Sequence, residues 1–414
     1  MSETDRLPAT PTVSFCVPTY NRARYLRSLL TILGNGLAQF RFTYEIVVTD
    51  NASTDDTPAV LAEFAARLPL RTLRHPTNLG VYPNLLSSYT HARGVYLVYV
   101  ADDDMILPLA LEAVITAMEQ YPSIGVVYAP WLLHDLVADT SLGAFYHQTD
   151  DVLVPQRDHA ALLDHILAAK AFPEIGVLRA SVWRECAPRT YTTAYWAFTH
   201  AAEYLRAADV LFAATPYYVS ISRYFADDTR AQIGAQEAEV AWDTYRGGLE
   251  SILARAKVAD ARRHGFLRRI DDMIGERLAV AVRLRSLRNA DSVECYLLAL
   301  RATALGAAAL LPLPLISLAV RAMLWFLVND AELNRGRPRV LCVGAFPAGY
   351  VEFLQQIGGG RVTFDGSATD LAGAHDCVMF FRAPPVIDDA VRRSLGEANV
   401  ALVLEPDLLA RFPA

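Results

Sequence analysis

The feature that most constrains the fold is a repeated alternation of short apolar runs and amphipathic segments, which begins near Thr12. Five apolar runs have the length of buried strands, and they lie at 13–18, 44–50, 70–75, 95–102 and 124–131. Apolar side chains at helical spacing fill the segments between them, at 22–33, from Thr57-Pro58 onward, at 81–92 and at 108–121. Strands that alternate with helices of this length predict an α/β fold, with a mostly parallel sheet flanked by helices.

Acidic residues stand where two of these strands end. Asp50 closes the second run, and Asp102, Asp103 and Asp104 close the fourth. Because parallel sheets bind ligands at the carboxyl ends of their strands, these side chains are candidates for a site. Three adjacent carboxylates repel one another, and Mg²⁺ or Mn²⁺ would neutralise them together with the phosphate oxygens of a substrate. The simpler interpretation is a solvated acidic turn before the helix near Pro108.

The composition limits the class of protein. With 414 residues the chain can form two or three domains, and 53% hydrophobic against 20% charged residues indicates large buried surfaces or membrane contact. A net charge of −7 offers no basic field for nucleic acid. We expect a cytoplasmic protein with free thiols, since the five cysteines are scattered and the N-terminus lacks an apolar secretory segment.

A helical segment at 246–330 is the candidate for membrane contact. Residues 302–320 carry no charge, which is the length needed to cross a bilayer, but Pro312 and Pro314 interrupt the run. Three interpretations stay open: a hairpin at the membrane surface, a buried pair of helices, or a true span. The arginine-rich stretch before it, at 250–290, is either a solvated helical face or a surface for anionic lipid or an acidic glycan.

A second α/β pattern occupies residues 338–414. Four short apolar runs alternate with helical segments at 348–358 and 388–398, which predicts a small Rossmann-like unit. The first turn, from Gly344 to Gly349, lacks the spacing of a dinucleotide fingerprint. A packing or docking role is therefore favoured over ligand binding.

Three quoted segments carry a resemblance to a known family. They are "VPTYNR" at 17–22, "VVTDNASTDDT" at 47–57, and the run from Asn78 through "ADDDMILP" at 101–108. In this order and spacing they resemble family 2 glycosyltransferases with the GT-A fold, over about residues 12–130. The resemblance implies a glycosyltransferase domain at 1–245, with a nucleotide half at 12–130 and an acceptor half at 131–245.

The resemblance also implies roles for individual residues. Pro18, Thr19 and Tyr20 would line the base pocket, and Asp50 would accept a hydrogen bond from the base, which a pyrimidine fits best. Asn78 and Gly80 would pass near the nucleotide. Asp102 would face the ribose or the metal, and Asp103 and Asp104 would hold Mn²⁺ or Mg²⁺. The acidic run fits the family pattern in two registers, so the working pair stays open.

The implied reaction is transfer of a sugar from a nucleoside diphosphate with inversion, which needs a general base near the acceptor hydroxyl. Here the chain departs from the pattern, because Trp196-Ala197 stands where the family carries an acidic pair. The candidates nearby are Glu203, His200 and Glu174, with Asp209 a weaker fourth. Two of them have a structural alternative: Glu203 could pair with Arg206 or another surface arginine, and His200 could be a packing residue.

The leading interpretation is a metal-dependent, inverting glycosyltransferase in polysaccharide biosynthesis, acting on a glycan, lipid-linked or protein acceptor. We also expect peripheral contact with the inner face of the membrane through 302–328. The alternative is a non-catalytic scaffold of the same fold that binds sugar nucleotides or glycans, favoured by the missing acidic pair. A sugar-nucleotide pyrophosphorylase would need a glycine-rich loop after the first strand, which "VPTYNRARY" lacks.

Overall fold

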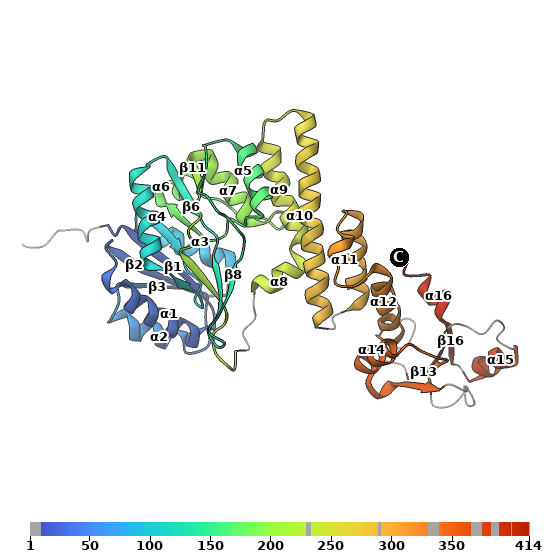
Figure 1. The fold of residues 1–414 in the computed structure, drawn as a ribbon. Coiled ribbons are helices and arrows are strands. Elements are labelled where there is room, and N and C mark those ends of the chain that lie inside the picture. Colours follow the sequence, from blue (N-terminus) through green and yellow to red (C-terminus); the bar gives the residue numbers. More distant parts are fainter. Residues whose placement is uncertain are drawn as a thin grey trace, which may run out of the picture. The chain divides into compact units, whose positions relative to one another are not determined.

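The computed structural model describes residues 10–228, 233–288, 291–329, 339–365, 375–381, 389–398 and 400–413. The chain divides into two compact units, one of Met1–Ala231 with Asp243–Ile270 and one of Gln232–Trp242 with Asp271–Ala414. Figure 1 shows the elements of both, coloured along the sequence.

The first unit is built on an eight-stranded sheet. Its strands follow the order β3 (Leu70–Arg74), β2 (Tyr44–Asp50), β1 (Val13–Thr19), β4 (Tyr96–Tyr99), β10 (Gly176–Arg179), β6 (Ile124–Tyr128), β11 (Asp209–Phe212) and β9 (Val152–Val154). The first four strands are parallel, whereas β10 runs antiparallel to both of its neighbours. The expected α/β class with a mostly parallel sheet is confirmed.

Helices flank this sheet (Figure 1), and the first of them shows the apolar periodicity expected from the sequence. In α1 (Ala23–Gly36) the buried side chains are Leu26, Leu29, Leu30 and Leu33, which recur at helical spacing. The remaining helices of this part of the chain are α2 (Thr57–Ala65), α3 (Val81–His91), α4 (Pro108–Gln120), α5 (His159–Ala169), α6 (Ala180–Cys186), α7 (Trp196–Ala207) and α9 (Trp242–Arg255), with a 3₁₀ turn η1 (Leu37–Gln39).

A second sheet of four short strands adjoins the acidic turn. Its order is β5 (Met105–Ile106), β12 (Tyr218–Arg223), β7 (Leu132–Asp135) and β8 (Thr140–Ala144). Because β12 pairs antiparallel with β5, residues 218 and 219 lie beside residues 105 and 106. A strand from far along the chain thus borders Asp102–Asp104.

The second unit begins with helices. They are α8 (Ile233–Val240), α10 (Asp260–Leu287, which starts in the first unit), α11 (Ser292–Ala304), the 3₁₀ turn η2 (Ala308–Leu310) and α12 (Leu315–Asn329). The uncharged run 302–320 ends α11, forms a turn that contains Pro312 and Pro314, and begins α12. Among the described residues, no helix has both the length and the apolar character that a bilayer crossing requires. Pro312 and Pro314 explain the break between α11 and α12.

The C-terminal part of this unit is a parallel sheet in the order β14 (Val362–Asp365), β13 (Val340–Val343), β15 (Cys377–Phe380) and β16 (Ala401–Leu404). Its helices are α14 (Ala348–Gly358), α15 (Asp389–Glu397) and α16 (Glu405–Leu409), with the 3₁₀ turn η3 (Gly359–Arg361). The predicted Rossmann-like unit is confirmed. One apolar core joins Met323 and Leu327 of α12 to Val340 and Cys342 of β13, so α12 packs with this sheet.

Candidate active site

The carboxyl ends of β1, β2 and β4 bring the predicted nucleotide residues to one edge of the sheet. Thr19 and Asp50 are register partners at the last positions of β1 and β2, and both are buried. Asp102–Asp104 follow β4, which pairs with the other side of β1. Parallel pairing therefore brings Thr19 close to Asp50, 31 residues later in the chain, and to Asp102, 83 residues later.

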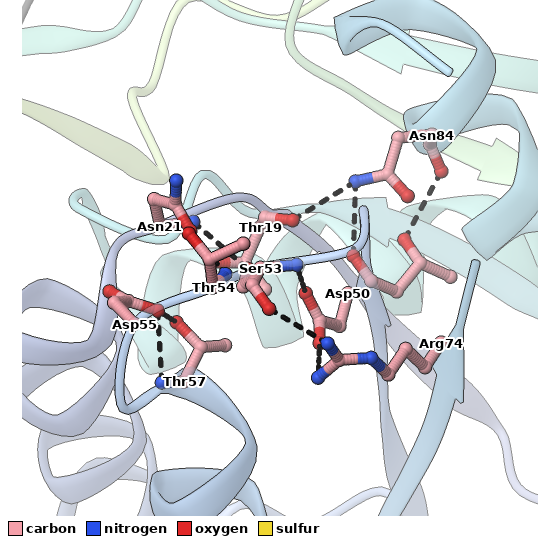
Figure 2. Close-up of polar contacts among 10 residues, drawn as sticks. Thr19, Asn21, Asp50, Ser53, Thr54, Asp55, Thr57, Arg74 and Asn84 are labelled. Atoms are coloured by element: carbon pink, nitrogen blue, oxygen red, sulfur yellow. Dashed lines mark hydrogen bonds and ion pairs between the residues drawn. The ribbon is translucent and has the colours of Figure 1, made fainter. Parts of the chain in front are cut away.

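Asp50 is held by two donors from opposite directions. The Ser53 N–H donates to its Oδ1 at 2.8 Å, and Arg74 Nη1 donates to its Oδ2 at 3.0 Å. Arg74 also donates to the Ser53 carbonyl at 2.8 Å, so the three groups form a closed set (Figure 2). The sequence interpretation missed Arg74, although its place at the end of the predicted third strand, beside the second, was an available signal.

The loop after Asp50 is hydrogen-bonded to the N-termini of two helices. Asp55 accepts hydrogen bonds from the Ala23 N–H, which starts α1, and from the N–H and hydroxyl of Thr57, which starts α2. Asn21 joins the same loop by accepting from the Thr54 N–H at 2.7 Å (Figure 2). The shape of this edge is thus set by short polar side chains that satisfy helix N-termini.

Asn78 and Gly80 lie in a turn tied to the end of β2. Asn51 donates to the Asn78 Oδ1 at 2.8 Å and to the Gly80 carbonyl at 3.1 Å, and its own Oδ1 accepts from Leu79 N–H. Gly80 has φ of 89°, a conformation that favours glycine. Of the other predicted base-pocket residues, Pro18 is half-buried and Tyr20 is exposed.

The three adjacent aspartates have three different environments. Asp102 is buried and accepts from the Thr19 hydroxyl at 2.6 Å, whereas Asp103 is half-buried beside Arg22, with Nη1 to Oδ2 at 3.4 Å. Asp104 is buried and accepts from Tyr218 and from the backbone of β12. Burial, with the charge of Asp103 adding to it, raises the pKa of Asp102 to about 8.

The four residues proposed from the sequence as the general base have different surroundings in the structure. Glu203 lies 2.6 Å from Arg255 Nη2 and 3.6 Å from Arg206 Nε. His200 is buried, its ring contacts Trp196 and Tyr204, its Nε2 lies 3.2 Å from the Arg189 carbonyl, and burial lowers its pKa to about 4. Both side chains thus make the kinds of contact given above as their structural alternatives.

Glu174 and Asp209 complete that set. Asp209, at the start of β11, accepts from the Gln156 N–H. Glu174 precedes β10 and accepts from the Tyr195 hydroxyl at 2.8 Å. Burial raises the pKa of Tyr99 well above its ordinary value, and the charges of Asp104, Asp103, Asp102 and Glu174 add to that effect. Glu174 thus acts electrostatically on the same phenol as the acidic turn.

The chain matches the family model described as glycosyl transferase family 2 over residues 14–132. Among curated relatives, an uncharacterised protein of Mycobacterium tuberculosis is 34% identical over 115 residues, 27% of this chain and 33% of the relative. The abequosyltransferase RfbV of Salmonella typhimurium is 32% identical over 143 residues, 34% of this chain and 43% of that protein. The chain thus spans less than half of the length of these relatives.

Solved structures give weaker likenesses. TarS residues 1–349 of S. aureus, in complex with UDP-GlcNAc, is 18% identical with a TM-score of 0.48, covering 71% of this chain and 88% of that one. The mannosyltransferase PcManGT of Pyrobaculum calidifontis, in complex with GDP-Man and Mn²⁺, is 17% identical with a TM-score of 0.42, covering 76% and 88%.

Proposed function

We propose that this chain transfers a sugar from a nucleoside diphosphate, with inversion, to a glycan, lipid-linked or protein acceptor, a proposal supported by the match of residues 14–132 to the model described as glycosyl transferase family 2. The observation that carries the proposal is the shared edge of β1, β2 and β4, where Thr19, Asp50 and the acidic turn converge. The proposed donor pocket comprises Pro18, Thr19, Tyr20, Asp50, Asn78, Gly80 and Asp102. Arg74 joins it because it holds the Asp50 carboxylate.

A divalent cation suits the acidic turn. Hard carboxylate oxygens are ligands for Mg²⁺ and Mn²⁺, and a cation would reverse the electrostatic cost that raises the pKa of buried Asp102. Among the described residues no group of three or more acidic, histidine or cysteine side chains is arranged to hold a metal ion. Asp102 and Asp103 would therefore share the ion with donor phosphates and water. The ion would supply positive charge to the departing diphosphate.

For the general base we propose Glu174. Glu174 precedes β10, which pairs with β4, and the Tyr195 hydroxyl orients its carboxylate; its charge and those of the acidic turn all raise the pKa of Tyr99. Its carboxylate would take the proton of the acceptor hydroxyl as that oxygen bonds to the anomeric carbon. The bond from that carbon to the diphosphate breaks, and its electron pair leaves with the diphosphate.

We further propose that a lipid surface is approached through the turn between α11 and α12. From Ala302 to Val320 the chain has no charge, and Leu310, Pro312, Pro314 and Ile316 are exposed. An exposed, uncharged, apolar turn fits shallow insertion at a membrane interface better than it fits water. The proposed location is the cytoplasm, with peripheral attachment at the inner face of the membrane.

The test of the function is a hydrolysis and binding screen of the purified chain against nucleotide sugars, with Mn²⁺, Mg²⁺ or a chelator. Slow release of one sugar in the presence of metal is expected, together with a rise in Tm caused by its nucleoside diphosphate. Asp103→Asn should remove the metal-dependent part of that rise. Binding of a donor without any turnover would favour the non-catalytic scaffold, and binding of none would refute both.

A further inference from the structure

Asp104 differs from its two neighbours because β12 holds it by both oxygens. The Ile221 N–H donates to its Oδ1 at 2.8 Å, and the Tyr218 hydroxyl donates to its Oδ2 at 2.9 Å. Asp104 and Tyr218 are both buried. A buried carboxylate with a donor on each oxygen is a stable anchor for the backbone that carries it.

The direction of the Tyr218 hydrogen bond is fixed by its second partner. The Ala101 N–H donates to the Tyr218 oxygen at 2.9 Å, so the single phenolic proton is directed at Asp104. Ala101 and Asp104 also bond to each other, with Asp104 N donating to the Ala101 carbonyl at 3.3 Å. One phenol therefore closes both ends of the turn that contains Asp102 and Asp103.

Strand pairing supports this closure from the other side of the turn. Tyr218 is the register partner of Ile106 and Val219 that of Met105, and Leu107 N donates to the Tyr217 carbonyl at 2.8 Å. Residues 101 and 104–107 are thus bonded to β12 or its preceding residue. Asp102 and Asp103 instead contact β1 and the loop after it, through Thr19 and Arg22.

We propose that Tyr218 and Asp104 are positioning residues, which hold the turn so that Asp102 and Asp103 are the pair presented to the donor and its cation. The inference rests on the proposed function, and it resolves the register that the sequence leaves open. Partners that orient metal ligands through a hydrogen bond change metal affinity by about 10- to 100-fold when they are removed. Loss of the phenolic hydroxyl should therefore weaken cation binding without unfolding the protein.

The test compares Tyr218→Phe with Tyr217→Phe in the full chain. Tyr217 is the adjacent buried tyrosine, and its hydroxyl has no hydrogen-bond partner among the described residues, so its removal controls for loss of a buried phenol. Mn²⁺ affinity is measured by electron paramagnetic resonance with UDP present, and amide hydrogen exchange is followed in the peptide spanning 96–107. Tyr218→Phe should weaken Mn²⁺ at least about tenfold and speed exchange in that peptide, whereas Tyr217→Phe should do neither.

Two further variants test whether Asp104 positions the turn while Asp103 binds the cation. Asp103→Asn should abolish Mn²⁺ binding. Asp104→Asn should also weaken it, and the double variant should weaken it by less than the product of the two single factors, since both changes remove the Tyr218–Asp104 hydrogen bond and Tyr218→Phe additionally removes the acceptor of the Ala101 N–H. Equal behaviour of the two tyrosine variants, or loss of binding in Asp104→Asn as complete as in Asp103→Asn, overturns the inference alone. Wild-type protein that binds no Mn²⁺ refutes the metal-dependent function as well.

Discussion

Glu174 lies in a place that the sequence pattern did not favour. The family pattern directs attention to residues 196 and 197, and the nearest carboxylate along the helix is Glu203. The structure pairs Glu203 with two arginines and sets Glu174 in hydrogen-bond contact with Tyr195, the residue just before that position. The general base is therefore proposed to lie just before β10, at Glu174, and not in α7.

Glu174→Gln should lower kcat by about 10²- to 10⁴-fold and leave the KM for the donor nearly unchanged, because only proton transfer is lost. Steady-state kinetics on the donor found by the screen measures both constants. Glu203→Gln is the matched control, and it should retain turnover while losing at most about 1 kcal/mol of stability from its partly exposed ion pairs. The reverse pattern would return the base to α7.

Local sequence was sufficient to find Asp50 and Asp102–Asp104, because each stands directly after an apolar run. It could not find Tyr218, whose contact with Asp104 spans 114 residues, nor separate the three aspartates into different environments. Arg74 could be predicted only in part: its strand was predicted from the sequence, but the register that sets it beside Asp50 was not. Contacts between strands decide what each carboxylate can do.

At the level of elements, the helices and strands of the first 130 residues follow from apolar periodicity, whereas several later strands do not. β10 has four residues and β9 has three, too few for a pattern to be distinguished. The antiparallel insertion of β10 between β4 and β6 follows from pairing geometry alone. It is this strand that brings Glu174 toward the donor half.

Asp55→Ala should cost about 1–2 kcal/mol at pH 7, because Asp55 satisfies N–H groups at the starts of α1 and α2. Burial raises the pKa of Asp55, but hydrogen bonds from Thr57 and the Ala23 backbone outweigh it and hold the pKa below its ordinary value. The contribution is therefore present above about pH 4 and is lost as the pH falls through the folded pKa. Urea unfolding at pH 7 and pH 3 measures it.

Asp56→Ala is the control for that experiment, since Asp56 occupies the N-cap position of α2 without a side-chain capping bond. It should change stability by less than about 0.5 kcal/mol at either pH. Equal losses in the two variants would contradict the assignment of Asp55 as the shared cap.

Gly94→Ala should destabilise the first unit by about 2–3 kcal/mol, measured by thermal or urea unfolding. A Cβ there would lie 2.7 Å from Ser14 N and 2.9 Å from the Val13 carbonyl carbon, and backbone atoms of β1 cannot move aside cheaply. Gly265→Ala in α10 meets open space, and it should stabilise that helix by about 0.5–1 kcal/mol. Similar effects of the two changes would refute the close approach at Gly94.

On the scale of the whole chain, length and composition predicted several units but not their limits. The apolar run 302–320 was interpreted apart from residues 338–414, yet α12 shares a core with β13. The boundaries 1–245, 246–330 and 338–414 stay a proposal, to be set against the two compact units of the structure. Core sharing between distant segments is not visible in a linear pattern.

Leu310→Ser with Ile316→Ser should reduce binding to vesicles that contain anionic phospholipid by about tenfold or more, because two apolar side chains no longer enter the interface. The two residues are 55% and 52% exposed. Leu142→Ser on β8 is the control, since Leu142 is 56% exposed but lies outside the uncharged turn. Co-sedimentation measures the effect, and equal binding of all variants would contradict attachment through the turn.

The pairing of β12 with β5 has a consequence for biosynthesis. The segment that carries the family resemblance leaves the ribosome about 90 residues before Tyr218 does. The parallel strands can therefore assemble before the acidic turn is hydrogen-bonded to Tyr218 and β12. Until β12 is synthesised, Asp104 lacks both of its hydrogen-bond donors, whereas Thr19 and Arg22 can already contact Asp102 and Asp103. We therefore expect the nascent chain to bind a cation only late in its synthesis, after β12 has paired with β5. A chain that lacks β12 would not bind the donor.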